Sequence, residues 1–378
     1  MKHELEGEKN PCLRAEWIEK YFKGHVIGAD AAQRLGVSLR QFRRLCKGCR
    51  KDGIASLFHG LEKRPSNHRH PADFKKNILG LIRKKYYDCG PTLISEYLEE
   101  REGIGIHRET LRLWMRDEKL LVKQRKRQPY RSRRERKPCF GEMLQLDGSS
   151  HRWFGADGPK DCLISIIDDA TSVTASLFDH EETIRCACLL LWQWCKKHGV
   201  PLSIYADRRN AYISETLSES NGLFGQMCRN LKIKTIPAFS PQAKGRVERL
   251  NATHQDRLPS YLRLEGIANI NDANKHLAPY LARHNKLFST IPQDQADAHR
   301  KLPKNSSLDS VCFIETTRKV QNDWTIKLDA VVYQIKRRNY CPAKSTVHVR
   351  KTFSGNVQIF FKNQLLAYVT ISKPNTSG

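Results

Sequence analysis

The spacing of hydrophobic residues changes twice along the chain and divides it into three regions. Up to residue 122, apolar side chains recur every three or four positions, which predicts short amphipathic helices. From 138 to 300, short continuous apolar runs alternate with helical patterns, as is typical of a mixed α/β domain. From about Val311 the spacing becomes two, which predicts short strands. The expected fold class is therefore multidomain α+β.

The first helical region, residues 1–64, contains a helix-turn-helix pattern. Gly36 ends one predicted helix, and Ser38 is placed as the N-cap of the next. In that next helix Leu39, Phe42 and Leu45 form the apolar side. A basic second helix of this kind suits the major groove of DNA, although an ordinary basic helical hairpin would look similar. Its other sides carry four candidate DNA-binding residues: Arg40, Gln41, Arg43 and Arg44.

A second helical unit over 70–122 repeats the arrangement with helices at 74–87, 91–101 and 107–117. The last of these places Leu111, Trp114 and Met115 toward a core, and Arg108 and Arg112 are its candidate DNA-binding residues. Residues 123–137 follow as a linker with nine Lys or Arg and one Glu. Such a run is usually a solvated linker, but its arginines would also suit contact with DNA phosphates.

Three acidic residues stand out in the central region. Asp147 and Asp207 each end a short apolar strand, where a carboxylate is costly unless it is paired or binds a cation. Glu248 lies in the first turns of a predicted helix beginning near Arg246. Three carboxylates that converge would suit one or two Mg²⁺ ions, which can activate a water or 3′-OH against a phosphodiester. Because cations surround Glu248, an ordinary surface salt bridge is the alternative interpretation.

Composition points to a polyanionic partner. The 378 residues include 66 Lys and Arg against 40 Asp and Glu, a formal net charge of +26, which favours nucleic acid. The sequence contains no long apolar run, so we expect no membrane partner. The polar residues 1–10 do not resemble a signal peptide, and twelve scattered cysteines suit a reducing compartment, so we expect a cytoplasmic protein. The Cys46 and Cys49 pair alone is weak support for zinc.

Four motifs together resemble the core of the retroviral-integrase-like transposases. They are Leu-Asp-Gly-Ser at 146–149, Ile-Asp-Asp-Ala-Thr at 167–171, Tyr-Ala-Asp at 205–207 and Ser-Pro-Gln-Ala-Lys-Gly-Arg-Val-Glu-Arg-Leu-Asn at 240–251. Among transposases of bacterial insertion sequences, the match is nearest to the ISNCY type. The last motif is the most specific, and the resemblance covers most of the chain, including the N-terminal helix-turn-helix.

The resemblance implies a ribonuclease-H-like catalytic core over 138–300 with Asp147, Asp207 and Glu248 as catalytic and metal-binding residues. The expected cofactor is Mg²⁺ or Mn²⁺. The expected partners are double-stranded DNA, as element inverted repeats and target, and further copies of the chain in a dimer or larger assembly on the nucleoid. The expected reaction is cleavage at the element's ends and joining of the 3′-OH ends to target DNA. Lys244 and Arg246 would hold DNA phosphates or the glutamate loop, and plain solvation of both side chains is the alternative interpretation.

Three further features of the sequence bear on this interpretation. Asp168 and Asp169 compete as acids, but we interpret them as turn and cap residues rather than metal ligands. Pro259 lies where the glutamate helix should continue, so we expect the helix to end there or the copy to be impaired. Residues 310–373 contain strand patterns at 324–328, 331–335, 346–349, 357–361 and 365–371, which predict a small SH3-like β-barrel.

Two other functions stay open at this stage. A transposase copy that kept its helix-turn-helix units but lost cleavage would act as a sequence-specific DNA-binding protein, and Pro259 favours it. A ribonuclease or resolvase with the same core would cut RNA–DNA hybrids or branched DNA without needing repeat ends. Metal-dependent strand cleavage at repeat ends distinguishes all three.

Overall fold

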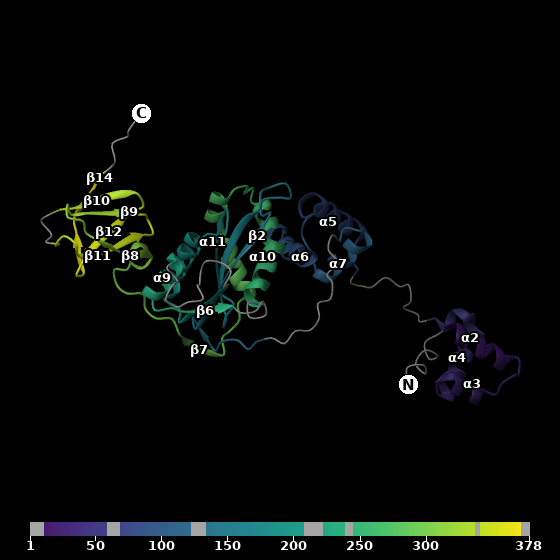
Figure 1. Ribbon diagram of the computed structural model, residues 1–378. Coiled ribbons are helices and arrows are strands. Elements are labelled where there is room, and N and C mark those ends of the chain that lie inside the picture. Colours follow the sequence, from purple (N-terminus) through teal and green to yellow (C-terminus); the bar gives the residue numbers. More distant parts are fainter. Residues whose placement is uncertain are drawn as a thin grey trace. The chain divides into compact units, whose positions relative to one another are not determined.

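The structure is a computed structural model that describes residues 11–58, 69–121, 134–207, 222–238, 245–336 and 341–371. The chain divides into two compact units, Met1–Ile78 and Leu79–Gly378, and each is described by itself. Figure 1 labels the helices and strands used below. Among the described helices, none combines the length and the hydrophobicity needed to cross a bilayer.

Over residues 11–58, the first unit contains the helices α2 (Pro11–Phe22), α3 (Gly28–Arg34) and α4 (Leu39–Asp52) and the 3-10 turn η1 (Gly53–Leu57). The expected helix boundary is confirmed, because Gly36 has φ +67° and the Ser38 hydroxyl accepts a hydrogen bond from Gln41 N at 3.2 Å. Leu35 and Phe42 are fully buried in the unit's core. The basic residues of α4 are therefore left on its outer faces.

Helix α5 (Ala72–Lys85) leads from the first unit into the second, which continues with α6 (Pro91–Glu102) and α7 (Arg108–Asp117). Gly103 follows α6 with φ +67°, so a glycine ends this helix as it ended α3. Leu111 and Met115 are buried, as the spacing predicts. His107 caps α7 by accepting a hydrogen bond from Glu109 N at 3.3 Å.

A five-stranded mixed sheet forms the centre of the second unit. Its strand order is β4-β3-β2-β5-β6. Strands β2, β3 and β4 are antiparallel neighbours, whereas β5 and β6 run parallel to β2. The bounds are β2 (Met143–His151), β3 (Asp161–Asp168), β4 (Thr174–Asp179), β5 (Ser203–Asp207) and β6 (Lys234–Ala238). A separate parallel pair joins β1 (Cys139–Phe140) to β7 (Asp294–Asp297).

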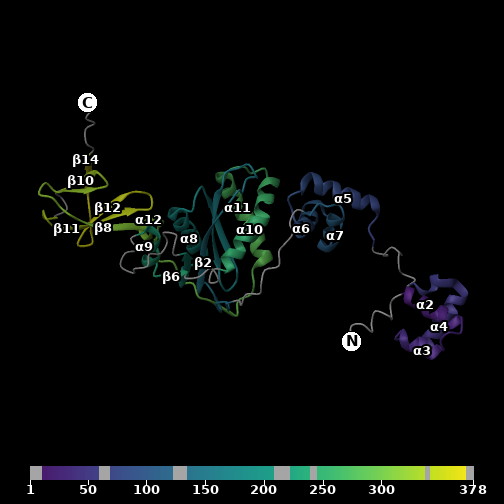
Figure 2. The same ribbon diagram turned by 45° about the vertical axis from the view of Figure 1, so that its right-hand side comes forward.

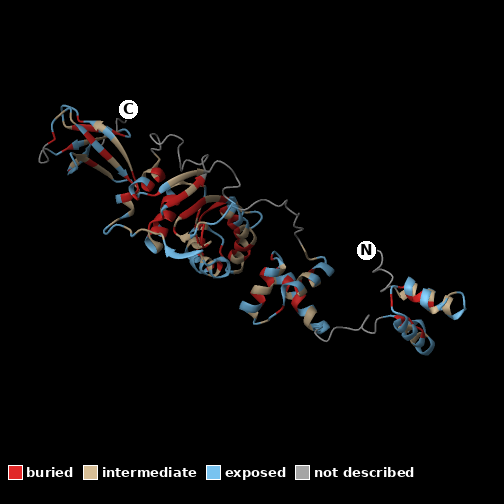
Figure 3. Cartoon of the chain, turned by 90° about the horizontal axis from the view of Figure 1, so that it is seen from below, coloured by how far each residue is buried: buried red, intermediate tan, exposed pale blue. Residues whose placement is uncertain are grey.

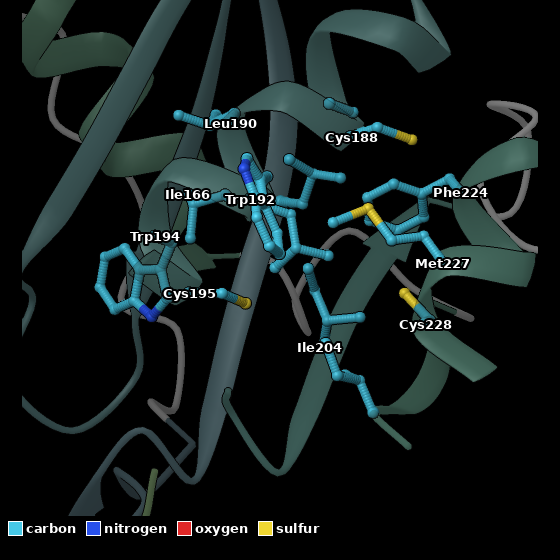
Figure 4. Packing of buried hydrophobic residues seen from close by; sticks show 14 of the residues in the cluster. Ile166, Cys188, Leu190, Trp192, Trp194, Cys195, Ile204, Phe224, Met227 and Cys228 are labelled. Carbon is cyan, nitrogen blue, oxygen red and sulfur yellow. The ribbon is translucent and has the colours of Figure 1, made fainter. Parts of the chain in front are cut away.

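Helices cover both faces of this sheet. Helices α8 (Ile184–His198) and α9 (Leu223–Asn230) lie on one face, and α10 (Gly245–Leu264) and α11 (Ile270–Phe288) lie on the other (Figure 2). Figure 4 shows Ile166 and Ile204 of the sheet gathered with Trp192 of α8. Buried residues concentrate in the strands and on the helix sides that face them (Figure 3). Alternate residues of β3 therefore serve two separate cores: Ile164 and Ile166 pack with α8 and α9, whereas Leu163 packs with α10 and α11.

Helix α11 also closes the exposed edge of the sheet at β4. Asn274 accepts a hydrogen bond from Phe178 N at 2.8 Å and donates one to Phe178 O at 3.0 Å. Asn285 does the same with Thr174 N at 2.9 Å and Thr174 O at 3.0 Å. The two side-chain amides stand in for a neighbouring strand and block edge-to-edge pairing at these positions.

The expectation that the glutamate helix ends at Pro259 is wrong. Helix α10 continues through the proline to Leu264. Leu258, Ser260 and Leu262 are buried on either side of it, and this packing holds the helix together despite the lost backbone hydrogen bond. Helix α11 likewise contains Pro279 in its interior.

Pro259→Ala is expected to raise the free energy of unfolding by about 2–3 kcal/mol, because alanine restores the missing N–H and removes the ring's clash with the preceding turn. Chemical denaturation of both proteins would measure the change. An unchanged or lower stability would mean that the surrounding packing is built around the proline.

The C-terminal residues form two small sheets after the short helix α12 (Leu308–Val311). One sheet has the order β14-β10-β9 and the other β13-β12-β11-β8. Within residues 313–336 and 341–371 they do not close, so the predicted SH3-like barrel is not confirmed. The strands are β8 (Phe313–Lys319), β9 (Thr325–Leu328), β10 (Val331–Ile335), β11 (Thr346–Thr352), β12 (Val357–Phe361), β13 (Gln364–Leu366) and β14 (Tyr368–Ile371).

Tight turns explain the short strands. Asp329 and Ala330 have φ of +47° and +64°, and Lys362 and Asn363 have φ of +45° and +64°. Two consecutive left-handed residues are typical of two-residue hairpin loops, whose twist matches that of the strands they join. The run predicted as one strand at 365–371 is divided at Ala367 into β13 and β14, which pair in different sheets.

Candidate active site

Strand register brings the two candidate aspartates to the same level of the sheet. Met143 pairs with Ser203, Leu144 with Ile204 and Gln145 with Tyr205 along the parallel strands β2 and β5. Asp147 and Asp207 each lie two residues beyond the last of these pairs. Because side chains alternate with a period of two, both aspartates share the parity of Gln145 and Tyr205. The side chain of Asp207 lies outside the described part of the structure.

Helix α10 runs along β2 and is hydrogen-bonded to it at three successive levels. Gln145 Oε1 accepts from Val247 N at 3.2 Å, Asp147 Oδ2 accepts from Asn251 Nδ2 at 3.0 Å, and Ser149 Oγ accepts from Gln255 Nε2 at 2.9 Å. Two strand residues advance about 6.6 Å and four helix residues about 6 Å, so the spacings match. The helix is thereby held parallel to the strand with a defined register.

The position of Glu248 relative to Asp147 follows from this register. It lies in the first turn of α10, three residues before Asn251, and its side chain is exposed. Residues three apart are neighbours on a helix surface, so Glu248 lies one turn before the residue that contacts Asp147. Asp147 itself is half-buried, and the Oδ1 atom of Asn251 beside it is buried and has no hydrogen-bond partner among the described residues.

The donor chemistry fits a hard divalent cation. Asp147 and Glu248 offer carboxylate oxygens, the ligand type that Mg²⁺ and Mn²⁺ prefer, and no thiol or imidazole stands with them in the contacts described above. Among residues whose side chains the structure describes, no three His, Cys, Asp or Glu side chains gather closely enough to hold a metal. A three-carboxylate site would therefore need Asp207 as its third member.

Asp168 behaves as a turn residue. Its carboxylate is fully buried and accepts hydrogen bonds from Thr171 N and Thr171 Oγ1, each at 2.7 Å, and from Gly141 N at 3.0 Å. Burial raises the pKa of the Asp168 carboxyl, and the hydrogen bonds from Thr171 and Gly141 partly counter this effect. These contacts are those expected of a residue that closes the turn after β3.

Asp169 is also fully buried, but its carboxylate binds residues of three other segments: 134–137, β2 and α10. It accepts from Gln145 Nε2 at 2.8 Å and from Lys137 N at 2.8 Å. It also pairs with Arg246 Nη1 at 2.9 Å and with the Arg134 guanidinium. Since a carboxylate has about four acceptor positions, these partners occupy it.

Two curated proteins are similar to this sequence, whereas no protein-family model matches it. The first is y4bF, a protein of Sinorhizobium fredii named as a transposase, with 38% identity over 294 residues. That alignment covers 76% of this chain and 64% of y4bF, so the chain spans less than two thirds of its relative. The second, the transposase for insertion sequence IS1202 of Streptococcus pneumoniae, is 27% identical over 410 positions, covering 94% of this chain and 86% of that protein.

The chain is a homologue of insertion-sequence transposases. The predicted relationship to insertion-sequence transposases is thereby confirmed, while the ISNCY type and the D-D-E core stay predictions.

Solved structures of retroviral integrases are also similar to this transposase homologue. The HTLV-2 integrase catalytic core in complex with magnesium is 22% identical over 36% of this chain and 83% of that one, with a TM-score of 0.29. The simian T-cell lymphotropic virus intasome chain is 15% identical over 77% of this chain and 95% of that one, with a TM-score of 0.36. Scores this low do not define a shared fold.

The structure describes most of the candidate DNA-binding residues of the transposase homologue. Arg40, Gln41, Arg43 and Arg44 are exposed on α4, and Arg108 is exposed at the start of α7. Arg112 forms two hydrogen bonds to Glu109, at 2.8 and 2.6 Å. Arg246 is held by Asp169 and by the Arg134 carbonyl at 3.1 Å. Lys244 lies outside the described residues.

The sequence analysis gives no role to Gln145 and Asn251, and it interprets Asp169 only as a turn or cap residue. Gln145 and Asn251 connect β2 to α10, and Asp169 connects Gln145 to Arg246. A signal existed for Gln145, because a polar residue at an inward position of an apolar strand needs a buried partner. Asn251 and Asp169 stand in the motifs noted above, but their partners are distant in sequence.

Proposed function

We propose that this transposase homologue is a metal-dependent DNA transposase in which Asp147, Asp207 and Glu248 form the catalytic site. The observation that carries the proposal is the register of β2 against both β5 and α10. In this register Asp147 and Asp207 lie at the same level on adjacent parallel strands. The first turn of α10, which carries Glu248, lies beside Asp147. The relationship to y4bF and to the IS1202 transposase supports the same activity.

The donor set favours Mg²⁺ or Mn²⁺ as the cofactor. When bound, the metal supplies activation of a water or 3′-OH and stabilises the oxygen that leaves the phosphodiester. Asn251 orients the Asp147 carboxylate by donating a hydrogen bond to its Oδ2 atom. Glu248 is exposed at the start of α10, so a DNA strand could reach its carboxylate directly. Within the described residues, no buried contact of this side chain would have to break first.

DNA recognition is assigned to the two helical units, 1–64 and 70–122, joined to the core over 138–300 by the basic segment 123–137. The exposed basic residues of α4, and Arg108 of α7, support contact with DNA as helix-turn-helix elements. The net charge of +26 supports phosphate binding over a large surface. Cleavage of two element ends would require at least two copies on DNA, with 310–373 as an accessory β domain.

A strand-cleavage assay tests the proposal. Purified protein is mixed with labelled DNA that carries the flanking inverted repeat, with Mg²⁺ or with Ca²⁺, beside an Asp207→Asn variant. The expected result is Mg²⁺-dependent nicking at the repeat end, lowered by about 1,000-fold or more in the variant because one metal ligand loses its charge. Repeat binding without cleavage would contradict the proposed activity and favour a DNA-binding role.

A further inference from the structure

Buried Asp169 lies where three segments meet: the start of α10, which carries Glu248, the strand β2, which carries Asp147, and residues 134–137 at the end of the basic segment. We infer that Asp169 is a positioning residue: it sets the first turn of α10, and therefore Glu248, by orienting Gln145 and holding Arg246. The inference rests on the proposed function in so far as Glu248 is catalytic. Its structural part, that Asp169 orders the helix start, stands independently.

The first step concerns the orientation of the Gln145 side-chain amide, which is fully buried. A carboxylate can only accept hydrogen bonds, so Asp169 requires the NH₂ group of Gln145 to face it, at 2.8 Å. The amide oxygen must then point the other way, where it accepts from Val247 N at 3.2 Å. The Val247 N–H is one of the four at a helix start that have no partner within the helix.

The second step is the charge on Arg246, directly before Val247. Its guanidinium lies 2.9 Å from the Asp169 carboxylate and donates to the Arg134 carbonyl at 3.1 Å. Only 18% of the Arg246 side chain is exposed, so this contact is shielded from solvent. Two consecutive residues of the first turn, Arg246 by its side chain and Val247 by its backbone, are thus fixed through one carboxylate. Glu248 is the next residue.

The third step is the attachment of the basic segment. Residues 134–137 dock on the turn that contains Asp169. The Arg134 guanidinium and Lys137 N bind its carboxylate. Arg136 Nη1 donates to the carbonyls of Asp169 and Ala170, each at 3.0 Å, and to Ser172 Oγ at 2.9 Å. The same carboxylate therefore ties the end of the segment that leads from the helical units to the helix that carries Glu248.

Asp169→Asn tests the inference, with Asp168→Asn as the matched control. Both carboxylates are fully buried and adjacent, but Asp168 bonds only to Thr171 and Gly141 in the contacts given above. An asparagine at position 169 is neutral, so it no longer forms an ion pair with Arg246. Its NH₂ group can also face Gln145, and the Gln145 amide is then free to take the opposite orientation. Two measurements are made on the full chain: hydrogen exchange of a peptide covering 245–252, and the Mg²⁺ concentration that half-saturates nicking.

The expected result for Asp169→Asn is exchange at 245–252 about 10-fold faster, with 255–264 unchanged, and a half-saturating Mg²⁺ concentration raised about 10- to 100-fold. Asp168→Asn is expected to match the wild type in both. Equal changes in exchange and in Mg²⁺ dependence for the two variants would overturn the inference, since the loss of any buried carboxylate would then explain the changes. If Asp169→Asn does not fold, Gln145→Met, which removes both amide contacts, is expected to show the same two changes.

The two measurements separate this inference from the proposed function. If the wild type cleaves no DNA, the transposase assignment fails, and faster exchange at 245–252 in Asp169→Asn still supports the positioning role. If the wild type cleaves DNA and the exchange is unchanged, the positioning role fails while the transposase assignment stands.

Discussion

Glu248→Gln is expected to lower the rate of Mg²⁺-dependent nicking by about 1,000-fold or more, because it removes the charge of one proposed metal ligand. Its stability should change by less than about 0.5 kcal/mol, since the side chain is exposed on the first turn of α10. Nicking of labelled repeat DNA at saturating Mg²⁺, together with a thermal denaturation curve, would measure both. Loss of activity without loss of stability identifies a chemical role.

Asp256→Asn is the matched control for this prediction. It removes a half-buried carboxylate from the same helix two turns later, away from the level of Asp147, and is expected to retain nearly full activity. Equal activity of Glu248→Gln and the wild type would mean that Glu248 is a surface residue, the alternative that its cationic neighbours first suggested. Equal loss in both variants would point to DNA binding through the helix rather than to metal binding.

The local features of this fold were largely predictable. Strands 331–335 and 357–361 have the bounds that the alternation of apolar residues predicts, and Ser38 caps its helix as expected. Such features depend on neighbours a few positions away, which a single sequence displays. The strand carrying Asp147 was also predicted, but not its continuation past Gly148 to His151, because glycine normally suggests a break.

The parts that could not be predicted depend on long-range packing. Pro259 inside α10 contradicts local propensity because burial on both sides of it outweighs the lost hydrogen bond. The predicted barrel is not confirmed because alternation specifies strands but not which sheet each joins. Asp169 was grouped with Asp168 as a turn residue. Only the register of β2 and the path of α10 bring Gln145 and Arg246 to it.

Glu96→Gln is expected to lower the free energy of unfolding by about 3 kcal/mol, because it leaves the buried Arg257 without its counter-charge. Glu96 forms a two-point pair with Arg257 of α10, at 2.7 and 2.8 Å, and also pairs with Arg283 of α11 at 2.8 Å. The Arg257 side chain is only 10% exposed. Glu99→Gln, an exposed change on the same helix, is the matched control and should shift stability by less than about 0.5 kcal/mol.

The same pair predicts how stability depends on pH. Burial alone would raise the pKa of Glu96, but the hydrogen bonds and charges of Arg257 and Arg283 outweigh it, so the pKa in the folded protein lies below the ordinary value. A carboxyl with a lowered pKa stabilises the fold fully above its unfolded pKa of about 4.3 and loses this contribution as the pH falls through its folded pKa.

The stability difference between wild type and Glu96→Gln should therefore be constant above about pH 5 and shrink below about pH 4, where a protonated Glu96 resembles glutamine. Chemical denaturation of both proteins from pH 3 to pH 7 would measure it. A difference that stays constant across this range would mean that the changed hydrogen bonding of the amide, and not the loss of charge, accounts for the effect. A difference that shrinks on acidification would mean that the ion pairs of Glu96 themselves hold α6 against α10 and α11.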